Sequence, residues 1–337
     1  MKFVLITGMA RSGTTLLDKL LENLPSGHVA SQPLPLLFIE LKKVFYEKIG
    51  HPEKYYVLNH HFREKLYTPE DLADFLSSYP IPEDLLFKVF RDEGKYSGQQ
   101  RTYQDPRALA RRMAGFRLAE VLERLLLEIF GGEQDYLGLK EIYIEEYIPY
   151  FRRSNWEVAV ILRDLRSVVA SMNSGRGSIY TGSIKPSLFH IRNWRKSYKF
   201  WSMPEVYSVR FEGLIQNPSM ELADLISQIT STSQELKWPE VLIDEFGQDW
   251  KANSSHNALA SHFSEKLTRD QVVFFESYAA KELMAAGYAL TQVVEALSSI
   301  EDLPLEEPFE VDDERLSLAY SDSENQRLLE WSEMREA

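Results

Sequence analysis

The chain has no cysteine among its 337 residues. Disulfide bonds and thiolate metal sites are therefore excluded. Long hydrophobic runs are also missing, and no apolar stretch approaches the length of a membrane-spanning helix. The first expected strand begins at Phe3, which leaves no room for a signal peptide. We expect a cytoplasmic protein without a membrane span.

Positive charge is scarce, since 38 Lys and Arg residues face 51 Asp and Glu residues, for a net charge of −13. Residues 295–337 hold 14 acidic and 3 basic residues, so this segment carries −11 and residues 1–294 carry only −2. Nothing resembles the basic footprint of a nucleic-acid binder, so no nucleic-acid partner is expected. We expect residues 1–294 to form one domain and residues 295–337 to be an acidic C-terminal tail, solvated or docked at its periphery.

Residues 3–17, FVLITGMARSGTTLL, combine a short apolar run, a Gly/Ser loop and a segment with helical spacing of apolar residues. A strand, a glycine-rich loop and a helix N-terminus in this order form an anion site, because backbone N–H groups converge there and the helix dipole favours negative charge. Gly8 and Gly13 have the spacing of a phosphate loop, but Thr14 stands where the lysine of that loop is expected. The cation is Arg11, inside the loop.

Strand and helix patterns alternate along most of the chain. Residues 50–104 are rich in Tyr, His, Pro and charge, and predict an irregular insertion with short helices that covers a site. The pattern predicts strands at 28–30, 136–140, 156–162 and 206–211, and helices at 34–49, 106–130 (one long helix stopped by two glycines), 144–154, 186–203 and 218–229, with mostly helical structure after 239. We predict an α/β fold, a P-loop-type three-layer structure with a central parallel sheet flanked by helices.

A second segment with anion-binding residues follows the most strand-like run, WEVAVIL. Arg163 comes directly after it, with Arg166 and Ser171 next along the chain. Open α/β sheets bind ligands beyond the carboxyl ends of their strands, so two such segments indicate a ligand with phosphates at two places. A Walker NTPase also needs its lysine and an acidic Mg²⁺ ligand, and Asp164 follows an arginine rather than ending an apolar strand alone. No metal is expected.

Together these motifs resemble the sulfotransferase family, which uses 3′-phosphoadenosine 5′-phosphosulfate (PAPS). The resemblance lies in five stretches in family order between residues 6 and 288, namely GMARSGTTLL, GLKEIY, ILRDLRSVVASM, VRFEGLIQNP and WKANSSH. It implies PAPS as co-substrate and a small-molecule or glycan acceptor that receives the sulfuryl group on a hydroxyl or amine.

The resemblance also implies roles for individual residues. The 5′-phosphosulfate loop is carried over to Arg11, Ser12, Gly13, Thr14 and Thr15, and the 3′-phosphate motif to Arg163 and Ser171. The remaining nucleotide contacts are carried over to Phe211, which replaces the tyrosine of many members, and to Asn253, Ser254 and Ser255. Lys140 matches a lysine that points at the transferring group, and with Arg11 it is a catalytic candidate.

The general base is where the sequence departs from the family. In members related to the tyrosylprotein branch, a glutamate lies 21 residues after the loop arginine, and here that position is Gln32. Glutamine cannot take a proton, although it can orient the acceptor by hydrogen bonding. The other candidates are Glu141, which would point to the opposite face from Lys140 if the strand continues, and the histidines His190, His60 and His61.

Two alternative functions use the same scaffold. A nucleotide-binding protein without turnover is suggested by Gln32, and a P-loop kinase acting on a small molecule is opposed by the missing lysine. Trp194, in the helix that follows His190, is expected to be a packing residue. The sequence indicates neither the acceptor's identity nor the oligomeric state.

Overall fold

The computed structural model describes residues 1–50, 67–92, 103–173, 187–230, 241–243, 247–250, 262–292 and 309. Its centre is a five-stranded sheet with the order β2-β3-β1-β4-β5, in which every neighbouring pair is parallel. The strands are β1 (Lys2–Thr7), β2 (Gly27–Ser31), β3 (Tyr136–Lys140), β4 (Glu157–Leu162) and β5 (Tyr207–Arg210).

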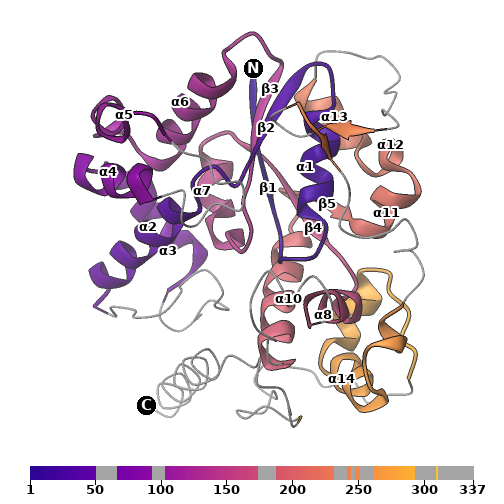
Figure 1. Cartoon of the computed structure of the whole chain (residues 1–337). Coiled ribbons are helices and arrows are strands. Elements are labelled where there is room, and N and C mark those ends of the chain that lie inside the picture. The colour runs from indigo at the N-terminus through magenta and orange to yellow at the C-terminus, as the bar shows by residue number, and fades with distance from the viewer. Residues whose placement is uncertain are drawn as a thin grey trace.

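Helices cover both faces of this sheet (Figure 1). The alternation of side chains along β1 shows why: Val4 and Ile6 belong to one apolar cluster, and Leu5 belongs to the other. The first cluster packs α1 (Thr14–Glu22) and α13 (Ala223–Ile229) on one face. The larger cluster packs the helices from α2 to α7, with α8 and α10, on the other face. The predicted α/β fold with its P-loop-type three-layer arrangement is confirmed.

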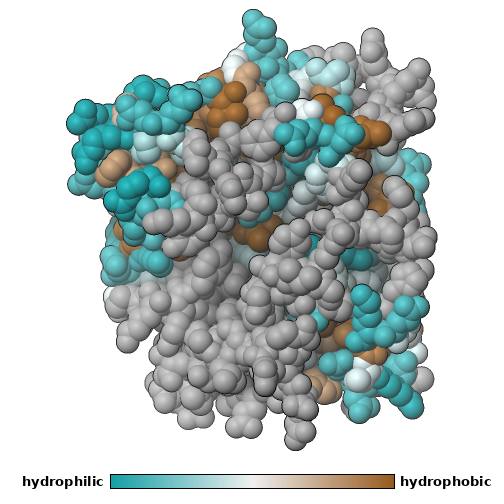
Figure 2. Space-filling view, viewed as in Figure 1, coloured by the Kyte–Doolittle hydropathy of each residue, from teal (hydrophilic) through white to brown (hydrophobic). Residues whose placement is uncertain are grey.

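The helices of the larger layer and of the C-terminal part have the following bounds: α2 (Pro35–Lys48), α3 (Pro69–Ser78), α4 (Glu83–Asp92), α5 (Pro106–Met113), α6 (Leu118–Phe130), the 3₁₀ helix η2 (Glu145–Tyr147), α7 (Ile148–Arg153), α8 (Leu165–Asn173), α10 (Ser187–Trp201), α11 (Phe211–Gln216), α12 (Pro218–Glu221), the 3₁₀ helix η4 (His262–Glu265) and α14 (Arg269–Ala285). The side of α4 and α5 that faces the viewer is mostly hydrophilic (Figure 2). Arg111 on α5 pairs with Glu83 on α4 at 3.3 Å. No helix of the described ranges is long and apolar enough to cross a membrane.

The prediction of one helix over 106–130 is wrong. The segment breaks at Gly115, which has a φ of 84° and connects α5 to α6. The backbone N–H of Gly115 donates to the Ile81 carbonyl, and the Ile81 N–H donates to the Phe116 carbonyl, both at 2.9 Å. Because these bonds join the break to the segment between α3 and α4, tertiary pairing replaces the helical bonds that the apolar pattern predicts.

Other boundaries also differ from the prediction. The helix expected over 218–229 is two short helices, α12 and α13, and the region after 239 contains an antiparallel ribbon of β6 (Leu242–Ile243) and β7 (Asp249–Trp250). In the expected insertion, α3 and α4 pack into the large cluster, while residues 51–66 and 93–102 lie outside the described residues. The acidic tail also lies outside them, except Phe309, whose ring is 5.5 Å from that of Phe274.

Candidate active site

Three non-glycine residues with positive φ follow the carboxyl ends of the three strands β1, β2 and β3. They are Arg11 at 69°, Gln32 at 49° and Tyr143 at 63°, and the described residues contain one more, Asn155, in the turn before β4. A non-glycine residue in this conformation is strained and persists only where its surroundings hold it, which is common at functional sites. Three of the four such residues therefore lie beyond the carboxyl ends of the strands, which makes this end of the sheet the candidate site.

The loop between β1 and α1 needs its two glycines because it lies close to neighbouring backbone and rings. Gly8 has a φ of 152°, and a Cβ there would be 2.5 Å from the Ile161 carbonyl oxygen. Gly13 has a φ of 99°, and a Cβ there would be 2.4 Å from Cδ2 of Phe211. Gly13 is the N-cap of α1 and has no side chain to cap it, so the first-turn N–H groups of the helix remain for an anion.

The two predicted anion-binding segments meet directly. The Arg11 Nε donates to the Ser171 Oγ at 3.1 Å, and the Arg163 Nη1 donates to the Arg11 carbonyl at 3.3 Å. These contacts join residues 160 and 152 positions apart in the sequence. Two guanidinium groups are thus gathered at the start of α1, where an anion with more than one charged group would meet both.

Arg163 is held on two sides. Its guanidinium carbon lies 4.3 Å from the centre of the Phe211 ring, and its carbonyl accepts a hydrogen bond from Nε1 of Trp194 at 2.7 Å. Burial lowers the pKa of Arg163; Glu212 raises that pKa, and the like charge of Arg11 lowers it further. A negatively charged phosphate bound beside both arginines would raise the pKa of Arg163 and so oppose the lowering by Arg11.

The loop's hydroxyl residues lie beside these arginines in sequence. Ser12 and Thr14 are buried, and Thr15 is half-buried. The Ser12 Oγ has no hydrogen-bond partner among the described residues. A buried hydroxyl without a partner is costly, and an anionic ligand at the loop would give it one.

Arg166, the other arginine of the second segment, has a different task. Its guanidinium bonds both oxygens of Asp164, at 2.9 and 2.6 Å, and also pairs with Glu276 on α14. Glu276 accepts from the Thr291 N–H at 2.8 Å. Arg166 therefore ties α8 to the end of the described C-terminal segment. Both oxygens of the Asp164 carboxylate thus bind this arginine. The described residues contain no cluster suited to a metal ion.

The acceptor-side candidates gather at the ends of β2 and β3. The Lys140 Nζ donates to the Gln32 Oε1 at 3.0 Å, and the Gln32 N–H donates to the Lys140 carbonyl at 2.8 Å. The strand ends at Lys140, so the strict alternation of side chains does not apply to Glu141. The Glu141 Oε1 accepts from the Leu34 N–H at 3.3 Å, so Lys140 and Glu141 both contact the 32–34 loop.

Glu141 is almost fully buried, at 1% exposed. Burial raises the pKa of Glu141 to about 8, although Lys140 and the Leu34 N–H lower it. A carboxyl with a pKa in this range exchanges protons near neutral pH, as a general base must. His190 is buried in α10 and its Nε2 is 3.2 Å from the Asn173 Oδ1 at the end of α8.

Some predicted site residues lie outside the described residues: His60, His61, Asn253, Ser254 and Ser255. The structure also adds Trp194 to the candidate site, although the sequence predicts it only as a packing residue. Trp194 is fully buried as expected, but its indole N–H also holds the Arg163 backbone. Amphipathic spacing along α10 predicts burial and carries no signal for this bond.

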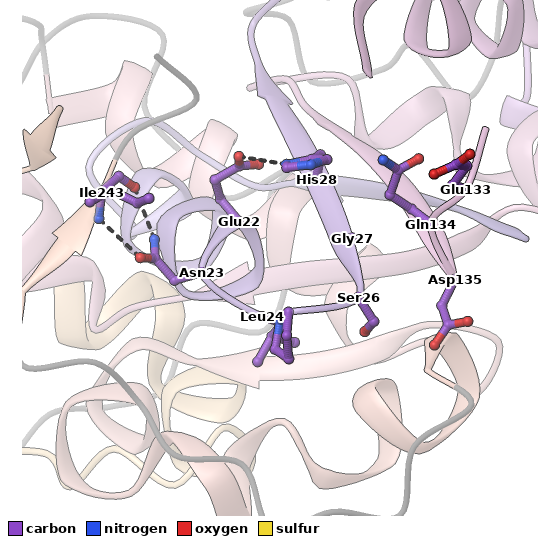
Figure 3. A pocket seen from close by; sticks show the side chains of 11 residues that line it. Glu22, Asn23, Leu24, Ser26, Gly27, His28, Glu133, Gln134, Asp135 and Ile243 are labelled. Carbon is purple, nitrogen blue, oxygen red and sulfur yellow. Dashed lines mark hydrogen bonds and ion pairs between the residues drawn. The ribbon is translucent and has the colours of Figure 1, made fainter. Parts of the chain in front are cut away.

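A pocket lies at the other edge of the sheet, between the end of α1 and the starts of β2 and β3 (Figure 3). The Glu22 Oε1 is 2.9 Å from the His28 Nδ1, while Glu133 and Asp135 complete an acidic rim. The arginines follow the carboxyl ends of β1 and β4, whereas this pocket adjoins the amino ends of β2 and β3. It is therefore separate from the candidate site.

Searches for related proteins found matches among solved structures. No family model matches the chain, and no curated protein matches it. Among solved structures, the "Sulfotransferase Domain from the Curacin Biosynthetic Pathway" aligns with 86% of this chain and 98% of its own, at 16% identity and a TM-score of 0.42. At this identity and TM-score, the match adds nothing on family or activity to what the site geometry supports.

Proposed function

We propose that the protein is a sulfotransferase that moves a sulfuryl group from PAPS to a hydroxyl or amine of a small-molecule or glycan acceptor. The observation that carries the proposal is the contact of Arg11 with Ser171 and of Arg163 with Arg11, beside the uncapped start of α1. PAPS has anionic groups at both its 5′ and 3′ positions, which suits two arginines from two segments. The sequence resemblance independently pairs the same residues with those two groups.

The reaction needs little covalent chemistry from the protein. The acceptor oxygen or nitrogen attacks sulfur, the bond from sulfur to the 5′-phosphate oxygen breaks, and adenosine 3′,5′-bisphosphate leaves. Sulfuryl transfer resembles phosphoryl transfer in its loose transition state with spread charge, so positioning and charge stabilisation supply the catalysis. Arg11, Lys140 and the N–H groups at Thr14 and Thr15 are suited to stabilise that charge. The leaving group is already a stable phosphate, so the proposal includes no metal.

The acceptor's proton requires a base other than Gln32. Glu141 lies next to Lys140, contacts the same loop as Lys140, and has its pKa raised to about 8. His190 instead pairs with Asn173. These contacts favour Glu141, which would take the acceptor proton as the new bond to sulfur forms. Gln32, bonded to Lys140, would orient the acceptor.

Isothermal titration with adenosine 3′,5′-bisphosphate tests the nucleotide site. We expect wild-type protein to bind it, and Arg163→Ala to weaken this binding at least tenfold while affecting adenosine 5′-phosphate much less. Arg111→Ala is the matched control, because Arg111 is an exposed arginine on α5 that pairs with Glu83. Absence of wild-type binding at millimolar nucleotide would refute the proposal.

A nucleotide-binding protein without turnover is the second candidate, and the neutral side chain of Gln32 is the observation that favours it. A panel of phenols, sugars, alcohols and amines with PAPS separates the two. Release of adenosine 3′,5′-bisphosphate that depends on an acceptor supports the transferase, and tight PAPS binding without release supports the alternative. The kinase alternative gains no support. Arg166 bonds both carboxylate oxygens of Asp164, and the described residues contain no cluster suited to the Mg²⁺ that a kinase needs.

A further inference from the structure

Two tryptophans on α10 use their indole N–H groups in the same way on neighbouring parts of the sheet. Trp194 donates to the Arg163 carbonyl at 2.7 Å, just beyond the end of β4. Trp201 donates to the Val209 carbonyl at 3.1 Å, within β5. The same helix therefore contacts two backbone carbonyls. Trp194 binds the carbonyl of Arg163, a cation of the candidate site, and Trp201 binds a carbonyl within a regular strand.

The bond to Arg163 lies where the regular backbone pattern stops. Arg163 falls between the last residue of β4, Leu162, and the first residue of α8, Leu165. A partly buried carbonyl between two elements needs a donor from elsewhere, and Trp194, itself fully buried, supplies one. Fixing this carbonyl fixes the peptide plane after Arg163, and with it the direction in which the Arg163 side chain leaves the backbone.

The side chain itself needs such support because its neighbour carries the same charge. Arg11 and Arg163 carry like charges, and Arg11 lowers the pKa of Arg163. The Phe211 ring and the Arg11 carbonyl hold the guanidinium, at 4.3 and 3.3 Å, and Trp194 holds the backbone. Without that third contact, the residue could relax away from Arg11 when no ligand is bound.

We propose that Trp194 is a positioning residue that presets Arg163 for the second phosphate, so that it contributes to the preference for nucleotides phosphorylated at both the 5′ and 3′ positions. The inference rests on the proposed function, because it needs Arg163 to contact that phosphate. Holding a binding group in place before the ligand arrives raises affinity by reducing the ordering that binding must impose.

The experiment compares Trp194→Phe with Trp201→Phe, each of which removes one indole N–H and keeps an aromatic ring. The dissociation constants for adenosine 3′,5′-bisphosphate and adenosine 5′-phosphate are measured by titration calorimetry, with thermal unfolding of each variant. We expect Trp194→Phe to reduce the preference for the bisphosphate about tenfold, or about 1.4 kcal/mol, and Trp201→Phe to leave the preference unchanged. A purely structural role would lower thermal stability in both variants without changing that preference.

Each outcome has a separate meaning. Equal weakening of both nucleotides by Trp194→Phe, or the same loss of preference in Trp201→Phe, would overturn the inference. A wild-type protein without any preference for the bisphosphate would instead refute the proposed function.

If Trp194→Phe does not fold, the wild-type indole signals give the answer by ¹⁵N NMR. The bisphosphate should then shift the assigned Trp194 N–H signal more than adenosine 5′-phosphate does. Equal shifts would overturn the inference.

Discussion

Burial gives Glu141, the proposed general base, a pKa suited to proton transfer near neutral pH. Glu141 is 1% exposed, and desolvation raises its pKa to about 8 against the opposing influence of Lys140. A carboxyl with an ordinary pKa is a weak base at neutral pH, whereas one near 8 is a much stronger base once it has lost its proton. Because of this raised pKa, we expect an increase in pH to raise the activity and to lower the stability of the protein.

For activity, the base works only when it is deprotonated. We expect turnover with a hydroxyl acceptor to rise with pH and level off above about 8, the folded-state pKa. Glu141→Gln should lower kcat by about 10²- to 10⁴-fold, the usual range for losing a general base, and remove this rise. Affinity for adenosine 3′,5′-bisphosphate should not change. A pH profile of the same shape in Glu141→Gln would assign the proton transfer to another group.

For stability, a carboxyl whose folded pKa is raised favours the protonated state in the native protein. Its stabilising contribution is present below 4.5, the ordinary pKa of a glutamate in the unfolded chain, and is lost as pH rises to about 8. We expect the urea midpoint of the wild type to fall over this interval more steeply than that of Glu141→Gln, which cannot ionise. Midpoints measured at intervals of one pH unit check this. Parallel curves would show that Glu141 ionises without cost.

At the scale of single residues, the spacing of short motifs predicted the positions of the site arginines better than it predicted the contacts between distant residues. The positions of Arg11, Arg163 and Ser171 follow from short motifs, and the structure brings all three together. The Gln32–Lys140 bond and the role of Trp194 depend on contacts across 108 and 31 residues, which no local pattern encodes. Arg166 has the same residue type and a similar place as Arg163, yet its acidic partners Asp164 and Glu276 fix it in a structural task.

At the scale of elements, a comparison of the turns at Gly13 and Gly115 distinguishes backbone strain from steric clash. Both glycines have positive φ, at 99° and 84°. A Cβ at Gly13 would meet the Phe211 ring at 2.4 Å, whereas a Cβ at Gly115 would meet nothing within 4 Å. A side chain at Gly13 would therefore meet both backbone strain and a steric clash, whereas a side chain at Gly115 would meet backbone strain alone.

Alanine substitutions test this difference. Gly115→Ala should lower the free energy of unfolding by about 1–2 kcal/mol, the cost of a Cβ in the left-handed region. Gly13→Ala should cost about 1–3 kcal/mol more because of the overpacking, and should also abolish nucleotide binding. Urea denaturation and titration calorimetry provide both readings. Equal losses of stability in the two variants would contradict the clash at Gly13.

The strands were predicted more accurately than the helices. The five strands of the main sheet are short apolar runs next to turn residues, and each was placed within about two residues of its observed bounds. The apolar pattern of 106–130 continues through Gly115, so it predicted one helix where there are two. The ribbon of β6 and β7 has two residues in each strand, which is too short to produce a periodic signal.

At the scale of the whole molecule, the parallel sheet brings separated motifs to one edge. Strand order places β1 between β3 and β4, so the residues that follow these three strands become neighbours (Figure 1). The loop before α1, Lys140 and Arg163 occupy this edge, while the acidic rim around His28 adjoins the other edge (Figure 3). Cationic groups therefore gather at the proposed nucleotide site of a protein whose net charge is −13.

This contrast leads to a prediction about association kinetics. A nucleotide bisphosphate is repelled by the net negative chain at long range and attracted by the arginines at short range. Residues 295–337 carry −11 of the total −13, so a chain ending at Val294 would carry −2. Added salt shortens the screening length from about 30 Å at 0.01 M to about 8 Å at 0.15 M, which suppresses mainly the long-range repulsion.

We expect the association rate constant of adenosine 3′,5′-bisphosphate with the full chain to rise as salt is added over this range. For the chain ending at Val294, where little repulsion remains, the rate should stay level or fall. The dissociation rate should increase with salt in both chains, because the contacts with Arg11 and Arg163 are weakened equally. Stopped-flow fluorescence measures both rate constants, and thermal unfolding checks that the shorter chain folds. The same salt dependence of association in the two chains would show that the charge of the tail does not act on the site.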